Sequence, residues 1–79
     1  MENGTYINNW GQFTDILKVD GDCLSLSTIS KNGREIVWDN VNIVDIGNYG
    51  TRISYGKGSS IPLTDKNGKL NTNFWEKDG

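Results

Sequence analysis

The sequence predicts an all-β domain: a small antiparallel barrel of about five strands, with an SH3-like topology as first choice and an OB-like topology as second. Two observations carry this prediction. No ten-residue window repeats apolar side chains with the spacing of an amphipathic helix. Glycines in turn-forming dipeptides divide the rest into short extended segments, at Gly21, Gly33, Gly47, Gly50, Gly56, Gly58 and Gly68. The 79 residues are expected to form one domain, 1–79.

Residues 5–8 are interpreted either as a short edge strand or as part of an N-terminal arm that spans 1–10. The first well-marked strand is 13–19, and Asp20-Gly21 after it is a residue pair typical of a type I′ turn before the next strand, 23–30. With these two residues as the loop, Leu17 lies opposite Leu24. One face then carries the predicted core, namely Phe13, Leu17, Val19, Leu24 and Leu26.

Asn32-Gly33 gives the strongest hairpin signal, because this pair adopts the positive φ angles of a two-residue turn. The pairing sets Ile29 opposite Ile36 and adds Val37 to the core face. The opposite face is then unusually apolar, so we expect another element to cover it. It carries Ile16, Cys23, Ile29, Ile36 and Trp38.

Poor strand formers at Asp39-Asn40 predict a bend, after which 41–46 continues at a new angle. A turn at 47–50, a strand at 51–55, a flexible glycine-rich loop at 56–60 and a short strand at 61–64 follow. Residues 65–79 are interpreted as a C-terminal tail whose apolar side chains either fold back as a lid, which we favour, or contact another chain.

Several kinds of chemistry find no support in the residue types. The chain has no histidine, which removes the commonest general base and metal ligand, and its single Cys23 has no imidazole to activate it. The Gly56–Ser60 loop precedes an extended Ile61-Pro62 segment, whereas a phosphate-binding loop precedes a helix. We therefore predict a non-catalytic protein without metal or cofactor.

Charge and hydropathy limit the kinds of partner and the cellular compartment that we expect. Ten acidic and eight basic residues give a net charge of −2, which argues against a protein that tracks nucleic-acid phosphates. The N-terminal sequence lacks the features of a signal peptide, and no apolar run approaches the length of a membrane span. We predict a cytoplasmic protein whose partner is another protein.

The leading hypothesis is a protein-binding module or small accessory protein, with an acidic inhibitor of a nucleic-acid enzyme as a sharper version. Aromatic residues make up 10% of the chain, and rings beside glycines are often partly exposed contact surfaces. Together with two basic residues and the aromatic tail, they give the predicted binding residues: Trp10, Trp38, Tyr49, Arg52, Tyr55, Lys57, Phe74 and Trp75.

Two alternatives remain open. In the first, the domain binds single-stranded nucleic acid, with Trp38, Tyr49 or Tyr55 stacking bases and three cations meeting phosphates, namely Arg34, Arg52 and Lys57. Arg52 and Tyr55 fall on opposite faces of their strand, which weakens this alternative. In the second, the chain assembles into homo-oligomers through an uncovered edge strand or the Phe74-Trp75 tail. The peptide-binding signature of SH3 domains is absent.

Overall fold

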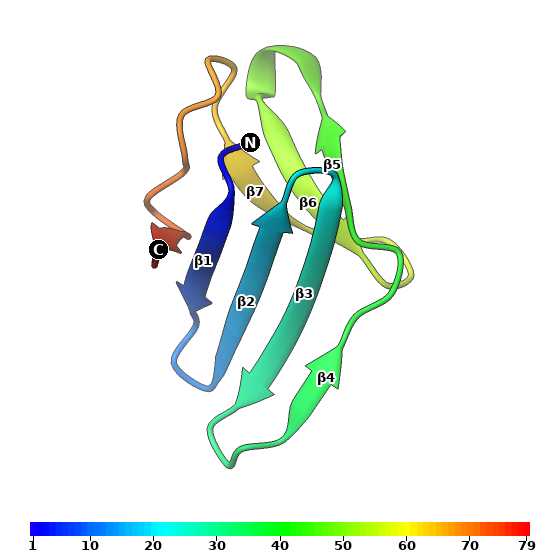
Figure 1. The fold of residues 1–79 in the computed structure, drawn as a ribbon, viewed down its shortest axis with the longest axis vertical. Coiled ribbons are helices and arrows are strands. Elements are labelled where there is room, and N and C mark those ends of the chain that lie inside the picture. The colour runs from blue at the N-terminus through cyan, green and yellow to red at the C-terminus, as the bar shows by residue number, and fades with distance from the viewer.

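The computed structural model describes all of residues 1–79 and has two antiparallel β-sheets packed against each other (Figure 1). Sheet A has the strand order β4-β3-β2-β1-β8 and sheet B the order β5-β6-β7. The strands are β1 Gly4–Asn9, β2 Phe13–Asp20, β3 Cys23–Ser30, β4 Glu35–Val37, β5 Asn42–Asp45, β6 Thr51–Tyr55, β7 Ser59–Thr64 and β8 Glu76–Lys77, with a short 3-10 helix, η1, at Gly47–Tyr49. The all-β prediction is confirmed. The sheets do not close into a barrel, so the SH3-like topology is not confirmed.

The N-terminal segment is a full member of sheet A. Strand β1 pairs with β2 over six residues and with β8 on its other side. Tyr6, in the middle of β1, is buried in the core. Of the two interpretations given for this segment, a strand or an arm, the structure has the strand, with Tyr6 and Asn8 buried in alternation. The strand is not at the edge of the sheet, because β8 pairs with its other side.

The first hairpin turns one residue later than predicted. Asp20 pairs with Cys23, so Gly21 and Asp22 form the loop. Only Gly21 has a positive φ, 59°, which is the pattern of a type II′ turn. Leu17 consequently lies opposite Leu26 instead of Leu24. Because the register moves by two residues, each side chain keeps its predicted face.

The second hairpin has a three-residue loop, and the predicted two-residue turn is wrong. Ser30 donates its backbone N–H to the Arg34 carbonyl, and its hydroxyl bonds to the Asn32 side chain inside the loop. Thr28 therefore pairs with Ile36. This one-residue shift moves Ile36 and Trp38 onto the face of sheet A that meets sheet B, called here the inner face, and moves Val37 to the outer face.

The outer face of sheet A lacks the cover that was expected. Sheet B lies on one side of sheet A only (Figure 1). Ile16 and Ile29 on this open side are nevertheless half-buried. The face is less apolar than predicted, because Ile36 and Trp38 belong to the inner face.

The bend predicted at Asp39-Asn40 is confirmed, and it carries the chain from sheet A to sheet B. Asn40 has a positive φ of 53°, and the Asp39 carbonyl accepts a hydrogen bond from Gly56 N in the β6–β7 turn at 2.8 Å. Strand β5 then begins at Asn42 in the second sheet. The bend thus fixes how the two sheets are stacked.

The core lies between the sheets and includes one residue from the C-terminal tail. Trp75 is 2% exposed, and its indole N–H donates to the Pro62 carbonyl at 2.7 Å. The tail folds back so that β8 adds to β1. The buried apolar set is Tyr6, Leu17, Val19, Leu26, Ile53, Ile61, Leu63 and Trp75. No helical segment has the length and apolar character needed to cross a lipid bilayer.

Candidate ligand-binding cleft

An open cleft forms where sheet A extends beyond sheet B. Three parts of sheet A project past sheet B: the start of β2, the end of β3 and the whole of β4 (Figure 1). Phe13 and Ile36 on this uncovered part of the inner face are 50% and 45% exposed. The cleft has a volume of about 460 Å³ and is lined by Trp10, Phe13, Asp15, Thr28, Ile36, Trp38 and Tyr55.

Asp15 forms the polar floor of this cleft. It lies on the same face of β2 as the core residue Leu17 and is only 4% exposed. One carboxylate oxygen, Oδ2, accepts the indole N–H of Trp10 at 2.5 Å, and the other, Oδ1, accepts the hydroxyl of Thr28 at 2.6 Å. A buried carboxylate requires such donors, because leaving it unbonded costs several kcal/mol.

Trp38 is held by a continuation of the same network. Its indole N–H donates to Thr28 Oγ1 at 2.8 Å, so the hydroxyl accepts from Trp38 and donates to Asp15. Its ring packs at a tilt against Tyr55 of sheet B, with centroids 5.0 Å apart. Behind the ring lies Gly56, where an added Cβ would lie 3.2 Å from the indole. Trp38 is thus fixed by contacts from both sheets.

Trp10 is fixed from the opposite side of the cleft. It sits in the tight β1–β2 turn, where its backbone N–H donates to the Phe13 carbonyl at 2.8 Å. Its ring meets Phe74 edge-on, with centroids 5.7 Å apart, while its N–H points to Asp15. Asp15 therefore bonds the Trp10 indole directly and is linked to the Trp38 indole through the Thr28 hydroxyl.

The electrostatics of the cleft are dominated by Asp15. No cationic side chain lies within 4.0 Å of it; the single ion pair of the structure joins Lys77 and Glu2, 3.6 Å apart. Burial, and secondarily the negative charge of Asp15, raise the pKa of the Tyr55 phenol above its ordinary value, so this wall of the cleft stays neutral. Asn8, directly opposite Asp15 on β1, is also buried, and its Nδ2 has no hydrogen-bond partner.

The structure brings together only part of the predicted binding set. Trp10, Trp38 and Tyr55 line the cleft, and Phe74 supports Trp10. Trp75 lies in the core and is buried.

The other predicted residues lie elsewhere. Tyr49, 84% exposed, precedes β6 and so lies at the opposite end of that strand from Tyr55. Arg52 alternates with Ile53 and points away from the core, where its Nε donates to Ser60 Oγ at 2.8 Å. Lys57 is exposed in the β6–β7 turn.

Sequence reasoning missed four lining residues, Phe13, Asp15, Thr28 and Ile36. A signal for Asp15 was available, because strand alternation places this carboxylate within the apolar face of β2. A charged residue in a predicted core row indicates either a buried polar network or a site. Ile36 was missed because the error in the turn placed it on the wrong face.

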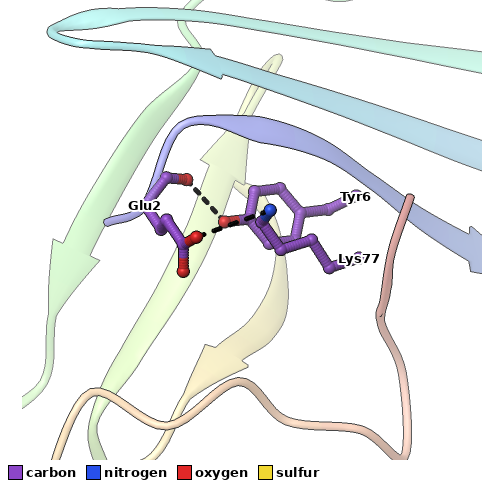
Figure 2. Close-up of polar contacts among 3 residues, drawn as sticks. All are labelled: Glu2, Tyr6 and Lys77. Carbon is purple, nitrogen blue, oxygen red and sulfur yellow. Dashed lines mark hydrogen bonds and ion pairs between the residues drawn. The ribbon is translucent and has the colours of Figure 1, made fainter. Parts of the chain in front are cut away.

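A second cleft of about 360 Å³ lies at the other end of the sheet interface. Figure 2 shows the polar contacts at its rim: the Tyr6 hydroxyl donates to the Glu2 backbone carbonyl, and the Glu2 carboxylate pairs with Lys77. Burial, and secondarily the charge of Glu2, raise the pKa of Tyr6. These contacts tie the N-terminal segment to β1 and β8, so we interpret this region as structural.

No three His, Cys, Asp or Glu side chains lie close enough together to hold a metal ion. No family model matches the chain, and comparisons with curated proteins and with solved structures give no significant match.

Proposed function

We propose that this domain is a non-catalytic protein-binding module, and that its cleft receives a side chain from an extended segment of a partner protein. The supporting observation is the Asp15 network, which holds the two indoles in fixed positions at a concave apolar surface open to solvent. Pre-oriented aromatic side chains bind with little loss of conformational entropy, and such rings dominate protein recognition sites.

Strand β4 gives the partner segment a place to lie. It is the last strand of sheet A. Along an antiparallel strand every second residue bonds to the neighbouring strand, and here the residues that bond to β3 are Arg34, Ile36 and Trp38. The N–H and C=O groups of Glu35 and Val37 therefore face away from the sheet. An extended segment paired with this edge would direct alternate side chains toward Ile36 and the cleft, which is the geometry of recognition by strand addition.

The two alternatives have weaker support. Trp38 and Tyr55 line the cleft, but Tyr49 and Arg52 lie away from it and Lys57 is not among its lining residues. The stacking and phosphate-binding groups of a nucleic-acid site are therefore gathered only in part. Homo-oligomerisation through the tail conflicts with the burial of Trp75, although the β4 edge would also serve self-association. The acidic-inhibitor version and the SH3-like classification stay predictions.

The proposal is tested by selecting ligands from a random-peptide display library on the immobilised full chain. Selected peptides are then titrated into the wild-type protein, Trp38→Ala, Ile36→Ser and the matched control Tyr49→Ala. We expect Trp38→Ala and Ile36→Ser to weaken binding at least about tenfold, a typical hot-spot loss, while Tyr49→Ala leaves affinity unchanged. Ile36 is exposed, so this variant keeps the test valid if Trp38→Ala unfolds.

Three outcomes would overturn the proposal. They are selected peptides that bind all variants equally, a library that yields no binder, and salt-dependent oligonucleotide binding that is lost in Arg52→Ala/Lys57→Ala. Light scattering of the free chain separates self-association from partner binding, because a dimer that dissociates in Val37→Lys would assign the β4 edge to a second copy of the chain.

A further inference from the structure

We propose that the cleft selects a weakly hydrated organic cation, namely an N-methylated ammonium group carried by the partner segment. This inference rests on the proposed function and names the chemistry that the cleft recognises. It is drawn from one juxtaposition: a buried carboxylate without a cationic partner lies at the floor of a cleft that is lined by two indoles, a phenyl and a phenol ring.

Asp15 is a buried carboxylate that no cation neutralises. Its two oxygens receive hydrogen bonds from neutral donors only, and no lysine or arginine neutralises it. Buried charges are normally paired, since an isolated charge is poorly stabilised away from water. A cation entering the cleft would complete this pair in surroundings where charges interact more strongly than in bulk water.

The aromatic lining decides which kind of cation fits. The faces of Trp, Tyr and Phe rings carry negative potential and attract cations, and Trp is the strongest of the three. Asp15 is 4% exposed and both its oxygens are already bonded, so it can offer an entering group charge but little direct hydrogen bonding. A primary ammonium would lose strong hydration without replacement. A methylated ammonium needs no hydrogen bonds and presents apolar surface to the rings.

The experiment compares two molecules of nearly the same shape that differ in charge. Choline, a trimethylammonium alcohol, and 3,3-dimethylbutan-1-ol, its neutral carbon counterpart, are titrated into the ¹⁵N-labelled full chain at matched ionic strength. The indole N–H resonances report occupancy. Those of Trp10 and Trp38 belong to the cleft network, whereas Trp75 bonds to Pro62 in the core and serves as the internal reference.

We expect choline to shift the Trp10 and Trp38 resonances saturably, to leave Trp75 in place, and to bind about tenfold more tightly than the neutral alcohol. Asp15→Asn should remove most of this preference. Its amide can accept from Trp10 and donate to Thr28, so the fold is expected to persist. The matched control Asp22→Asn removes the same charge from the exposed β2–β3 turn and should keep the preference.

Equal binding of the two molecules would overturn the cation proposal and leave the cleft as the peptide site. Choline binding that fails to move Trp10 and Trp38, or no choline binding at all, would also overturn it. Peptides from the display selection that require Trp38 would still support the protein-binding function in each of these cases. If Asp15→Asn does not fold, the comparison of the two molecules on the wild-type chain decides the question.

Discussion

Trp38, at the end of sheet A, packs against Tyr55 of sheet B with ring centroids 5.0 Å apart. The cleft is therefore built at the point where the chain crosses from one sheet to the other. Its shape depends on the turn that carries Gly56, which lies against the Trp38 ring, and on the Asp39-Asn40 bend, whose Asp39 carbonyl accepts a hydrogen bond from Gly56 N. Substitutions at this crossing are expected to affect stability and cleft geometry together.

Trp38→Phe separates the hydrogen bond of Trp38 from its ring. The phenyl ring can still pack on Tyr55. Thr28 Oγ1, however, loses the hydrogen bond that it accepts in the wild type from the Trp38 indole N–H at 2.8 Å. We expect a loss of about 1 to 2 kcal/mol in the free energy of unfolding by urea, from one hydrogen bond and a smaller buried ring. Tyr49→Phe, at an 84% exposed site, should change it by less than about 0.5 kcal/mol. Equal effects of the two substitutions would contradict the assigned role of the Thr28 bond.

Gly56→Ala tests the close approach of Trp38 to the β6–β7 turn. Gly56 has a φ of 61°, which costs a residue with a side chain about 1 kcal/mol, and the new Cβ would crowd the indole at 3.2 Å. Gly21→Ala is the matched control, because its φ is 59° and an added Cβ meets nothing within 4 Å. We expect Gly56→Ala to be the more destabilising of the two by thermal unfolding, and to shift the Trp38 indole resonance. Identical melting temperatures would mean that the turn yields without disturbing the ring.

The sequence was sufficient for the all-β class, because its turn residues and its alternation are local signals, but not for the arrangement of the strands as two open sheets in place of a barrel. The bend at Asp39-Asn40 was predicted from propensity alone and is the element that moves the chain between sheets. The hairpin at Asn32-Gly33 was located correctly, but its loop length was not. Whether a turn uses two or three residues depends on side-chain bonds such as that of Ser30 to Asn32, which dipeptide identity does not specify.

The candidate cleft was predicted only in part, because the sequence identified some of its residues but not the register that brings them together. Trp10, Trp38 and Tyr55 were recognised as contact residues from their ring type and their neighbouring glycines. The loop-length error reversed the face of Ile36 and separated Trp38 from Thr28, so the Asp15 network could not be deduced. Sheet B ends before it covers this part of the inner face. Where one sheet ends on another depends on contacts between distant residues, which no local pattern in the sequence predicts.

The C-terminal tail should be essential for folding. A chain that ends at Lys69 lacks Trp75, which is 2% exposed, and the β8 strand that covers the edge of β1. Removing a buried Trp side chain alone costs about 3 to 5 kcal/mol, comparable with the whole stability of a domain of this size. We expect the shortened chain to lose its cooperative urea transition, monitored by circular dichroism, whereas Thr72→Ala in the same segment keeps it. A folded chain ending at Lys69 would contradict the assignment of Trp75 to the core.

Tyr6 should make stability fall at alkaline pH. Its pKa is raised in the folded state by burial and by Glu2, so the unfolded chain releases this proton at a lower pH than the folded chain does. The stabilisation is fully present below pH about 10, the unfolded value, and is lost as the pH rises through the higher folded value. Tyr6→Phe removes this titration together with the hydrogen bond to the Glu2 carbonyl.

At pH 7 we therefore expect Tyr6→Phe to be less stable than the wild type by about 1 kcal/mol, the net contribution of one hydrogen bond. Between pH 9 and 11 the difference should narrow, because only the wild type loses the Tyr6 contribution, at a slope of up to about 1.4 kcal/mol per pH unit. Urea unfolding of both proteins across this range measures it. Parallel stability curves would show that the Tyr6 hydroxyl titrates alike in the folded and unfolded chains, and that the contact with Glu2 in Figure 2 does not persist in solution.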